Sequence, residues 1–257
     1  HPDLAGSYFS SPEGFYDTRR HYFFPTNDLT FGDQLNGNNA LYKLNDATLT
    51  LTDANNYTGG TFIEGGKLQI GNGGLSGSIV GDVAVSKGAE LGFNRSNSYT
   101  FAGSISGEGT VVQLGTGVTI LTGNSTYTGP TTISHGGLSV TGSLISDVTA
   151  QGNTFIDGNG SVGSLHAETG SKIAPGTRDR IGDLRIARDA TIQKGALLDI
   201  EIADDLSSAD RIDIGGKAIG DPPEDRLRLE PGHPVSGKDV DRRHDSHQHE
   251  MDGEAEP

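Results

Sequence analysis

The 257-residue sequence contains no cysteine and no tryptophan, and it has a single methionine. Without cysteine the chain cannot form disulfides, Cys-ligated zinc sites or thiol nucleophiles. Only 32% of the residues are hydrophobic, which is a poor supply for a helical bundle, whereas the 39 glycines favour strands and turns. No apolar run approaches the ~20 residues of a membrane-spanning helix.

Positive charge is also scarce, because 34 acidic residues face 19 Lys and Arg, a formal charge of −15. Such a chain offers no basic face to neutralise a phosphate backbone, so we expect no nucleic-acid partner. An acidic surface keeps a sheet-rich protein soluble by self-repulsion, and it suits a secreted protein.

Composition divides the chain into three zones. Residues 1–42 hold more than half of the sixteen aromatic residues and are predicted to form an N-terminal cap or linker. Residues 43–217 are rich in Gly, Thr, Ser and Asn. Residues 218–257 are predicted to be a disordered acidic tail, because from Asp221 onward they contain five of the ten prolines and almost no β-branched pattern.

The middle zone consists of short alternating runs such as residues 47–52 and 83–85, mostly bounded by Gly, Asn or Asp. This pattern predicts strands of ~5 residues joined by tight turns.

The middle zone also repeats itself. Residues 51–70 align without a gap on residues 121–140, at an offset of seventy residues. The residues shared by the two copies are, in the first copy, Leu51, Thr52, Tyr57, Thr58, Gly59, Thr61, Ile63, Gly66 and Leu68. They are alternating apolar positions and turn glycines, so they are predicted to serve packing rather than chemistry.

A coiled architecture accounts for this repeat. No single hairpin here could bury its apolar face, whereas stacked coils bury Leu, Ile and Val in a continuous column. We expect an all-β fold, a right-handed parallel β-helix (solenoid) of about eight coils, with three strands in each coil of ~22 residues. The seventy-residue offset is interpreted as an integer number of coils. An antiparallel sandwich is the alternative.

The two copies resemble a known family repeat. Residues 56–61, Asn-Tyr-Thr-Gly-Gly-Thr, followed by residues 65–70, Gly-Gly-Lys-Leu-Gln-Ile, are similar to the autotransporter-associated β-strand repeat. Residues 121–131 match its pattern equally well, and residues 158–163 look like the last passenger segment before the membrane domain. The resemblance covers residues 43–217.

This resemblance implies a type V secreted protein on the surface of a Gram-negative bacterium. Its passenger would be a stalk with a structural, adhesion or virulence role, and its partner a host or neighbouring-cell surface. The family's other partner is a C-terminal outer-membrane β-barrel, which does not follow Gly216 in this sequence. We expect a frameshift or an early stop to have produced the change to Asp221-Pro222-Pro223-Glu224.

Two enzyme hypotheses remain as alternatives. Residues 1–6, His-Pro-Asp-Leu-Ala-Gly, resemble the stretch after the catalytic Asp of subtilisin-like proteases, so the chain could be the noncatalytic remainder of an autotransporter serine protease. A β-helical polysaccharide lyase or hydrolase would need two acids across a groove. No complete catalytic site is present, and the chain is expected not to be an enzyme.

Two motifs resemble sites of chemistry. Residues 158–163, Gly-Asn-Gly-Ser-Val-Gly, match the dinucleotide fingerprint, but that loop must open a helix, so a turn is expected. Ser104 and Ser106 lack a nearby His and are expected to be turn residues.

Metal binding is not expected either. His244, His247 and His249 with Asp245 could ligate Zn, Ni or Cu, but a solvated tail is favoured. Four aspartates could suggest a calcium site: Asp204, Asp205, Asp210 and Asp213. Their spacing matches neither an EF-hand loop nor a calcium-binding β-roll, so we expect them to lie on a solvated face. We predict no cofactor.

Overall fold

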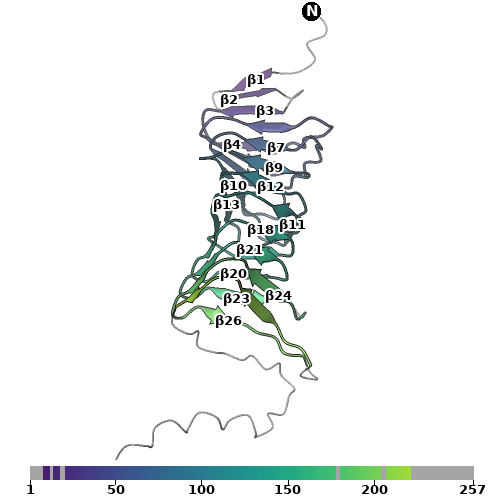
Figure 1. Ribbon diagram of the computed structural model, residues 1–257. Coiled ribbons are helices and arrows are strands. Elements are labelled where there is room, and N and C mark those ends of the chain that lie inside the picture. The colour runs from purple at the N-terminus through teal and green to yellow at the C-terminus, as the bar shows by residue number, and fades with distance from the viewer. Residues whose placement is uncertain (1–7, 12–13, 18–20, 178–179, 204–206, 221–257) are drawn as a thin grey trace, which may run out of the picture.

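The computed structural model describes residues 8–11, 14–17, 21–177, 180–203 and 207–220, and these form strands, bridges and turns without a helix. The strands stack in one column (Figure 1). Within these residues no helix is long and apolar enough to cross a membrane. Apart from residues 218–220, the predicted tail lies outside the described residues, as do His244, His247 and His249.

Two sheets contain the N-terminal strands. Sheet 1 has seven strands: β1 (Tyr8–Ser11), β2 (Gly14–Asp17), β3 (Tyr22–Pro25), β5 (Leu41–Lys43), β7 (Thr61–Ile63), β9 (Val83–Val85) and β12 (Ile105–Gly107). Sheet 2 has ten: β4 (Leu29–Phe31), β6 (Thr48–Leu51), β8 (Lys67–Ile70), β10 (Glu90–Phe93), β13 (Thr110–Gln113), β16 (Thr131–Ile133), β19 (Val148–Ala150), β22 (Leu165–Ala167), β25 (Ala190–Ile192) and β28 (Ala218–Ile219).

Two further sheets begin later in the chain. Sheet 3 has six strands: β11 (Tyr99–Phe101), β14 (Val118–Leu121), β17 (Gly137–Val140), β20 (Phe155–Gly158), β23 (Lys172–Pro175) and β26 (Leu197–Leu198). Sheet 4 has five: β15 (Asn124–Ser125), β18 (Ser143–Leu144), β21 (Ser161–Val162), β24 (Asp183–Ile186) and β27 (Arg211–Ile214).

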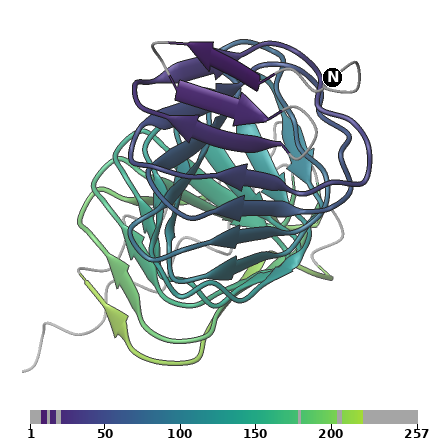
Figure 2. The ribbon, with the colours of Figure 1, turned by 90° about the horizontal axis from the view of Figure 1, so that it is seen from above.

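Parallel pairing between successive coils builds the column. One register file along sheet 2 runs through Leu49, Leu68, Leu91, Val111, Thr131, Val148, Leu165, Ala190 and Ala218. All of these residues are buried except Ala218 in the last strand. Eight steps therefore connect residue 49 to residue 218, about 21 residues a step. The predicted β-solenoid of about eight coils is confirmed, and Figure 2 shows the coils superimposed around a common interior.

The number of strands per coil changes along the stack. Coils before β11 contribute strands to sheets 1 and 2, and from β11 onward sheet 3 adds a third strand to each coil. Sheet 1 ends at β12, and in the next coil β15, which contacts β12, begins sheet 4. The predicted three strands per coil therefore hold only for the later coils.

The N-terminal end differs in direction from the rest. β1, β2 and β3 pair antiparallel, and β3 then pairs with β5 in parallel. Parallel pairing thus begins ahead of residue 43, with β3 and β4.

Inward side chains fill the column. The shared apolar residues of both repeat copies are buried, which confirms their predicted packing role; they are Leu51, Tyr57, Ile63, Leu68, Leu121, Tyr127, Ile133 and Leu138. The predicted strands at residues 47–52 and 83–85 are present as β6 and β9. Strands are shorter than predicted, with two to four residues each, because the turns between faces take up the remainder of each coil.

The seventy-residue offset is not an integer number of coils, and that prediction was wrong. In the first copy β7 lies in sheet 1 and β8 in sheet 2, whereas their counterparts β16 and β17 lie in sheets 2 and 3. The second copy is therefore displaced by one face. Coil length varies, since Leu68 pairs with Leu91 but Thr131 pairs with Val148, steps of 23 and 17 residues.

We predict that Leu91→Ala lowers the free energy of unfolding by ~2–5 kcal/mol, because it opens a cavity between Leu68 and Val111 in the adjacent coils. Leu75→Ala is the matched control. Leu75 is 68% exposed, so its truncation should change stability by less than about 0.5 kcal/mol. Urea unfolding followed by circular dichroism measures both, and equal losses would contradict the continuous core.

Candidate functional site

The repeat turns are the most regular feature of the chain. In the first copy the Tyr57 hydroxyl and Thr61 Oγ1 lie 2.6 Å apart, and in the second Tyr127 and Thr131 lie 2.5 Å apart. Each tyrosine is fully buried. Burial raises the pKa of both hydroxyls, that of Tyr127 to about 12. The Tyr-Thr-Gly-x-Thr motif therefore closes each turn with a buried hydroxyl pair.

Each copy is also bonded to the coil before it. Asn55 Oδ1 accepts a hydrogen bond from the Leu35 amide at 2.9 Å, and Ser125 Oγ accepts one from the Ile105 amide at 3.0 Å. In both cases the donor precedes the acceptor by twenty residues. In each copy, a side chain of the repeat therefore accepts a hydrogen bond from the backbone of the previous coil.

Glycine is required at two repeat positions. Gly66 and Gly136 have φ of +58° and +60°, and a Cβ atom at either would lie 2.4 Å from Asp46 O or 2.2 Å from Gly117 O. A Cβ at Gly129 would lie 2.0 Å from Gly109 O. The coils approach each other here too closely for any side chain.

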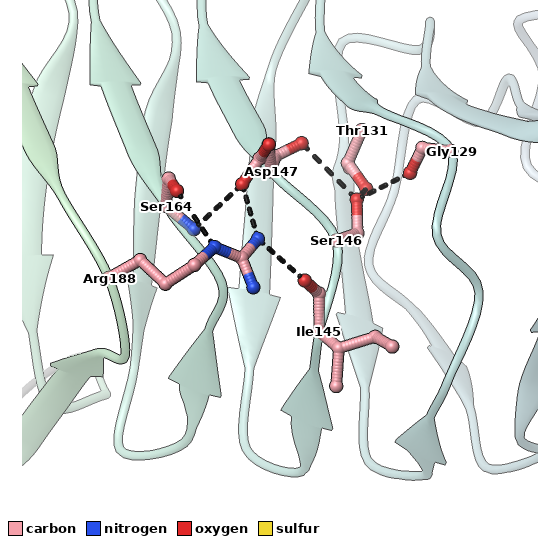
Figure 3. A network of polar contacts seen from close by, with 7 residues as sticks. All are labelled: Gly129, Thr131, Ile145, Ser146, Asp147, Ser164 and Arg188. Carbon is pink, nitrogen blue, oxygen red and sulfur yellow. Dashed lines mark hydrogen bonds and ion pairs between the residues drawn. The ribbon is translucent and has the colours of Figure 1, made fainter.

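An exposed polar network joins three later coils (Figure 3). Arg188 Nη2 donates to Asp147 Oδ1 at 2.5 Å and to Ile145 O at 2.9 Å, and Arg188 Nε donates to Ser164 Oγ at 3.2 Å. The hydrogen bonds from Arg188 and Ser164 hold the pKa of Asp147 below its usual value. Because the Arg188–Asp147 pair is exposed, we assign it at most about 1 kcal/mol.

Several aspartates accept hydrogen bonds from backbone amides of the following coil. The pairs are Asp28 with Thr48, Asp82 with Ser104, Asp147 with Ser164, and Asp189 with Lys217, at 2.8, 2.8, 3.1 and 2.8 Å. Part of the acidic composition therefore stabilises the contact between coils.

Asp210 corrects one expectation. It does not lie on a solvated face but is only 8% exposed, and its two oxygens accept hydrogen bonds from the Gly182 and Glu201 amides. Asp213 is exposed on β27, and Asp204 and Asp205 lie outside the described residues. Within the described ranges there is no group of three His, Cys, Asp or Glu that could hold a metal ion.

Lys43 is a buried cation that the sequence analysis missed. Its Nζ donates to Leu44 O, Asn45 O and Gly65 O at 2.9, 2.7 and 2.8 Å. Desolvation lowers its pKa to about 8, partly opposed by Asp46 and Asp28. The alternation of inward and outward residues in β5, with Leu41 buried and Tyr42 outward, would have predicted that Lys43 points inward. No local sequence pattern marks Arg188, because its partners lie as far as 43 residues away.

The motifs considered for chemistry take structural places. Residues 158–163 form the end of β20, a turn and β21, and no helix follows, so the helix N-terminus of a dinucleotide loop is missing there. Ser104 precedes β12, but Ser106 lies within this strand rather than in a turn, and its hydroxyl donates to Val83 O.

One outer face gathers two acids. Register aligns Asp157 of β20 with Ala174 of β23. Asp199 directly follows β26, whose Leu197 and Leu198 pair with Lys172 and Ile173 of β23. Lys172 forms an ion pair with Asp199 at 3.0 Å, and burial raises the pKa of Asp157, which accepts a hydrogen bond from Ser139. Asp199 therefore already has a cationic partner within the chain.

Comparison with protein families identifies the repeat. Residues 41–70 and 111–140 match the model of the Passenger-associated-transport-repeat. The two matches are offset by the same seventy residues as the hydrogen-bonded turns described above. The chain therefore carries two autotransporter passenger repeats.

Two curated relatives are both extracellular or autotransported. The chain is 44% identical over 80 residues to the adhesin BmaC autotransporter of Brucella suis biovar 1 (strain 1330), covering 31% of this chain and 2% of that protein. It is 34% identical over 124 residues to the extracellular serine protease of Serratia marcescens, covering 47% of this chain and 12% of that protein. The chain thus spans a small part of each relative.

We predict that Tyr57→Phe lowers the free energy of unfolding by about 1–2 kcal/mol, because Thr61 loses the buried Tyr57 hydroxyl. Tyr127→Phe should cost less, since Thr131 Oγ1 retains Ser146 Oγ at 2.7 Å. Chemical denaturation of the two variants provides the comparison. A larger loss for Tyr127→Phe would contradict this account of the turns.

We predict that the stability of the protein relative to Lys43→Met rises between about pH 8 and pH 10. The folded chain releases the Lys43 proton near pH 8 and the unfolded chain near 10.5, so in this interval the unfolded state binds more protons. The free energy of unfolding then increases with pH, by at most about 1.4 kcal/mol per pH unit. Urea unfolding across this range tests it, and a difference that stays constant or falls would contradict it.

Proposed function

We propose that this chain, which carries two passenger-associated transport repeats, is a segment of a secreted passenger that forms an adhesive stalk on the surface of a Gram-negative bacterium. The observation that carries the proposal is the repeat itself. Both copies match the family model, and both make the same bonds to the coil twenty residues earlier.

The proposal includes a division of labour along the chain. Residues 1–42 close the N-terminal end, and their strands β3 and β4 start the parallel pairing. Residues 43–217 form the stalk, and residues 218–257 are an acidic tail that begins with β28, which still pairs with β25. The antiparallel pairing of β1, β2 and β3 supports the capping role, because it interrupts the parallel edge on which further coils could stack.

Export across the outer membrane requires a C-terminal β-barrel, which is the partner that the passenger repeats imply. Stacked coils suit this route, because a solenoid forms mostly from contacts between neighbouring coils. A host or neighbouring-cell surface is the proposed adhesion partner. The similarity to an adhesin autotransporter supports this role.

The second candidate is the noncatalytic part of a secreted serine protease. The similarity to an extracellular serine protease over 47% of the chain favours it. In that case the solenoid would carry a protease domain away from the cell surface, and the chain itself would perform no hydrolysis.

Surface display tests the proposal. The chain, placed between a secretion signal and an autotransporter β-barrel in a Gram-negative host, should be digested by protease added to intact cells. It should also increase attachment of these cells to an epithelial monolayer relative to cells that display the barrel alone. The Leu75→Ala variant is a folded control.

Display without increased attachment would reject the adhesive role and favour the protease-carrier alternative. Failure of display, with the purified chain folded, would reject the passenger assignment.

A further inference from the structure

An aromatic row runs along the outer face of sheet 1. Tyr22 of β3, Tyr42 of β5 and Phe62 of β7 occupy one outward file. The ring centroids of Tyr22 and Tyr42 are 4.5 Å apart with an interplanar angle of 11°, and those of Tyr42 and Phe62 are 4.9 Å apart at 13°. Each ring therefore covers one face of the next, so that Tyr42 has both faces covered.

The row ends at Phe62. Its register partner in the next coil is Ala84 of β9, and the following partner is Ser106 of β12. These small side chains cannot cover the second face of Phe62, which is 36% exposed. The ring of Phe62 therefore projects beyond the small side chains of Ala84 and Ser106 on the outer face of sheet 1. We call the surface formed by these three residues the step.

The step is flanked by negative charge. Glu64 follows β7, Asp82 precedes β9 and Glu108 follows β12, and all three residues are exposed. Lys87 lies in the turn after β9, and together with the three acids it gives these four residues a net charge of −2. None of the three acids forms an ion pair with a described residue.

We propose that this step, made of Phe62, Ala84 and Ser106 with Glu64 and Asp82 beside it, binds an arginine or lysine side chain from a basic segment of a partner protein. A cation placed over the free face of Phe62 is attracted by the ring quadrupole. The adjacent carboxylates neutralise the positive charge of the bound side chain. The overall charge of −15 attracts basic segments to the chain. Arginine fits best, because its planar guanidinium both stacks on a ring and pairs with carboxylate.

A neutral sugar is the competing ligand for an exposed ring. Acidic flanks favour the cation, because a neutral sugar gains nothing from their charge. The inference rests on the proposed adhesive role, since it names the chemistry of the adhesion partner. Peptide binding to the purified chain tests the step, whereas cell attachment tests the function, so the two can fail separately.

The experiment measures binding of the peptide acetyl-Gly-Arg-Gly-Arg-Gly-Arg-amide by the shifts of protein NMR signals at low salt. A peptide with citrulline in place of arginine is the uncharged control. We expect Phe62→Leu, which keeps the apolar contact but removes the ring, to weaken binding by about two- to fivefold. Glu64→Gln and Asp82→Asn should each weaken it, and salt should reduce these two differences.

Two features make these variants informative. Asp82→Asn retains an oxygen that can accept the Ser104 amide hydrogen bond, so the coil contact survives. Leu75→Ala, on an exposed loop outside sheet 1, should leave binding unchanged.

Equal binding of the citrulline peptide, or unchanged binding by Phe62→Leu in a folded protein, would overturn the proposal. Binding of a neutral oligosaccharide that Phe62→Leu abolishes, with no peptide binding, would assign the step to sugars and also overturn it.

Discussion

The backbone of each coil depends on the coil before it, and the rest of the structure follows from this constraint. A short strand with two to four residues cannot satisfy its own amides and carbonyls, and it finds partners in the preceding and following coils. Side chains also bond to neighbouring coils: Asn55 and Asp82 each accept a hydrogen bond from a backbone amide of an adjacent coil. The stack can therefore lengthen without a change of principle, and its outer faces are left to vary.

Freedom of the outer faces explains how one repeat can serve in two settings. The repeat turn needs a buried Tyr–Thr pair and a backbone twenty residues earlier, and it needs no particular face. Its copies consequently lie on different sheets, one face apart. The outward residues then differ: an aromatic row with acidic flanks covers sheet 1 near the N-terminus, whereas Arg188 connects three coils further along (Figure 3).

Charge in this protein has two separate uses. Aspartates such as Asp189, together with the buried Asp210, hold backbone amides, and Lys43 holds three carbonyls within the N-terminal coils. These groups stabilise the contacts between coils. Exposed acids such as Glu64 form no ion pair with a described residue, and we propose that they bind a basic segment of a partner.

Composition and the internal repeat were sufficient to predict the class of fold, the number of coils and the packing role of Leu51, Tyr57 and Ile63, because periodic burial leaves a periodic sequence. They could not show that the second copy turns by one face, since coil length depends on turns whose geometry is not local. The Lys43 cage, the Arg188 network and the step at Phe62 also required the tertiary structure. Each joins residues from successive coils, and register between coils brings them together.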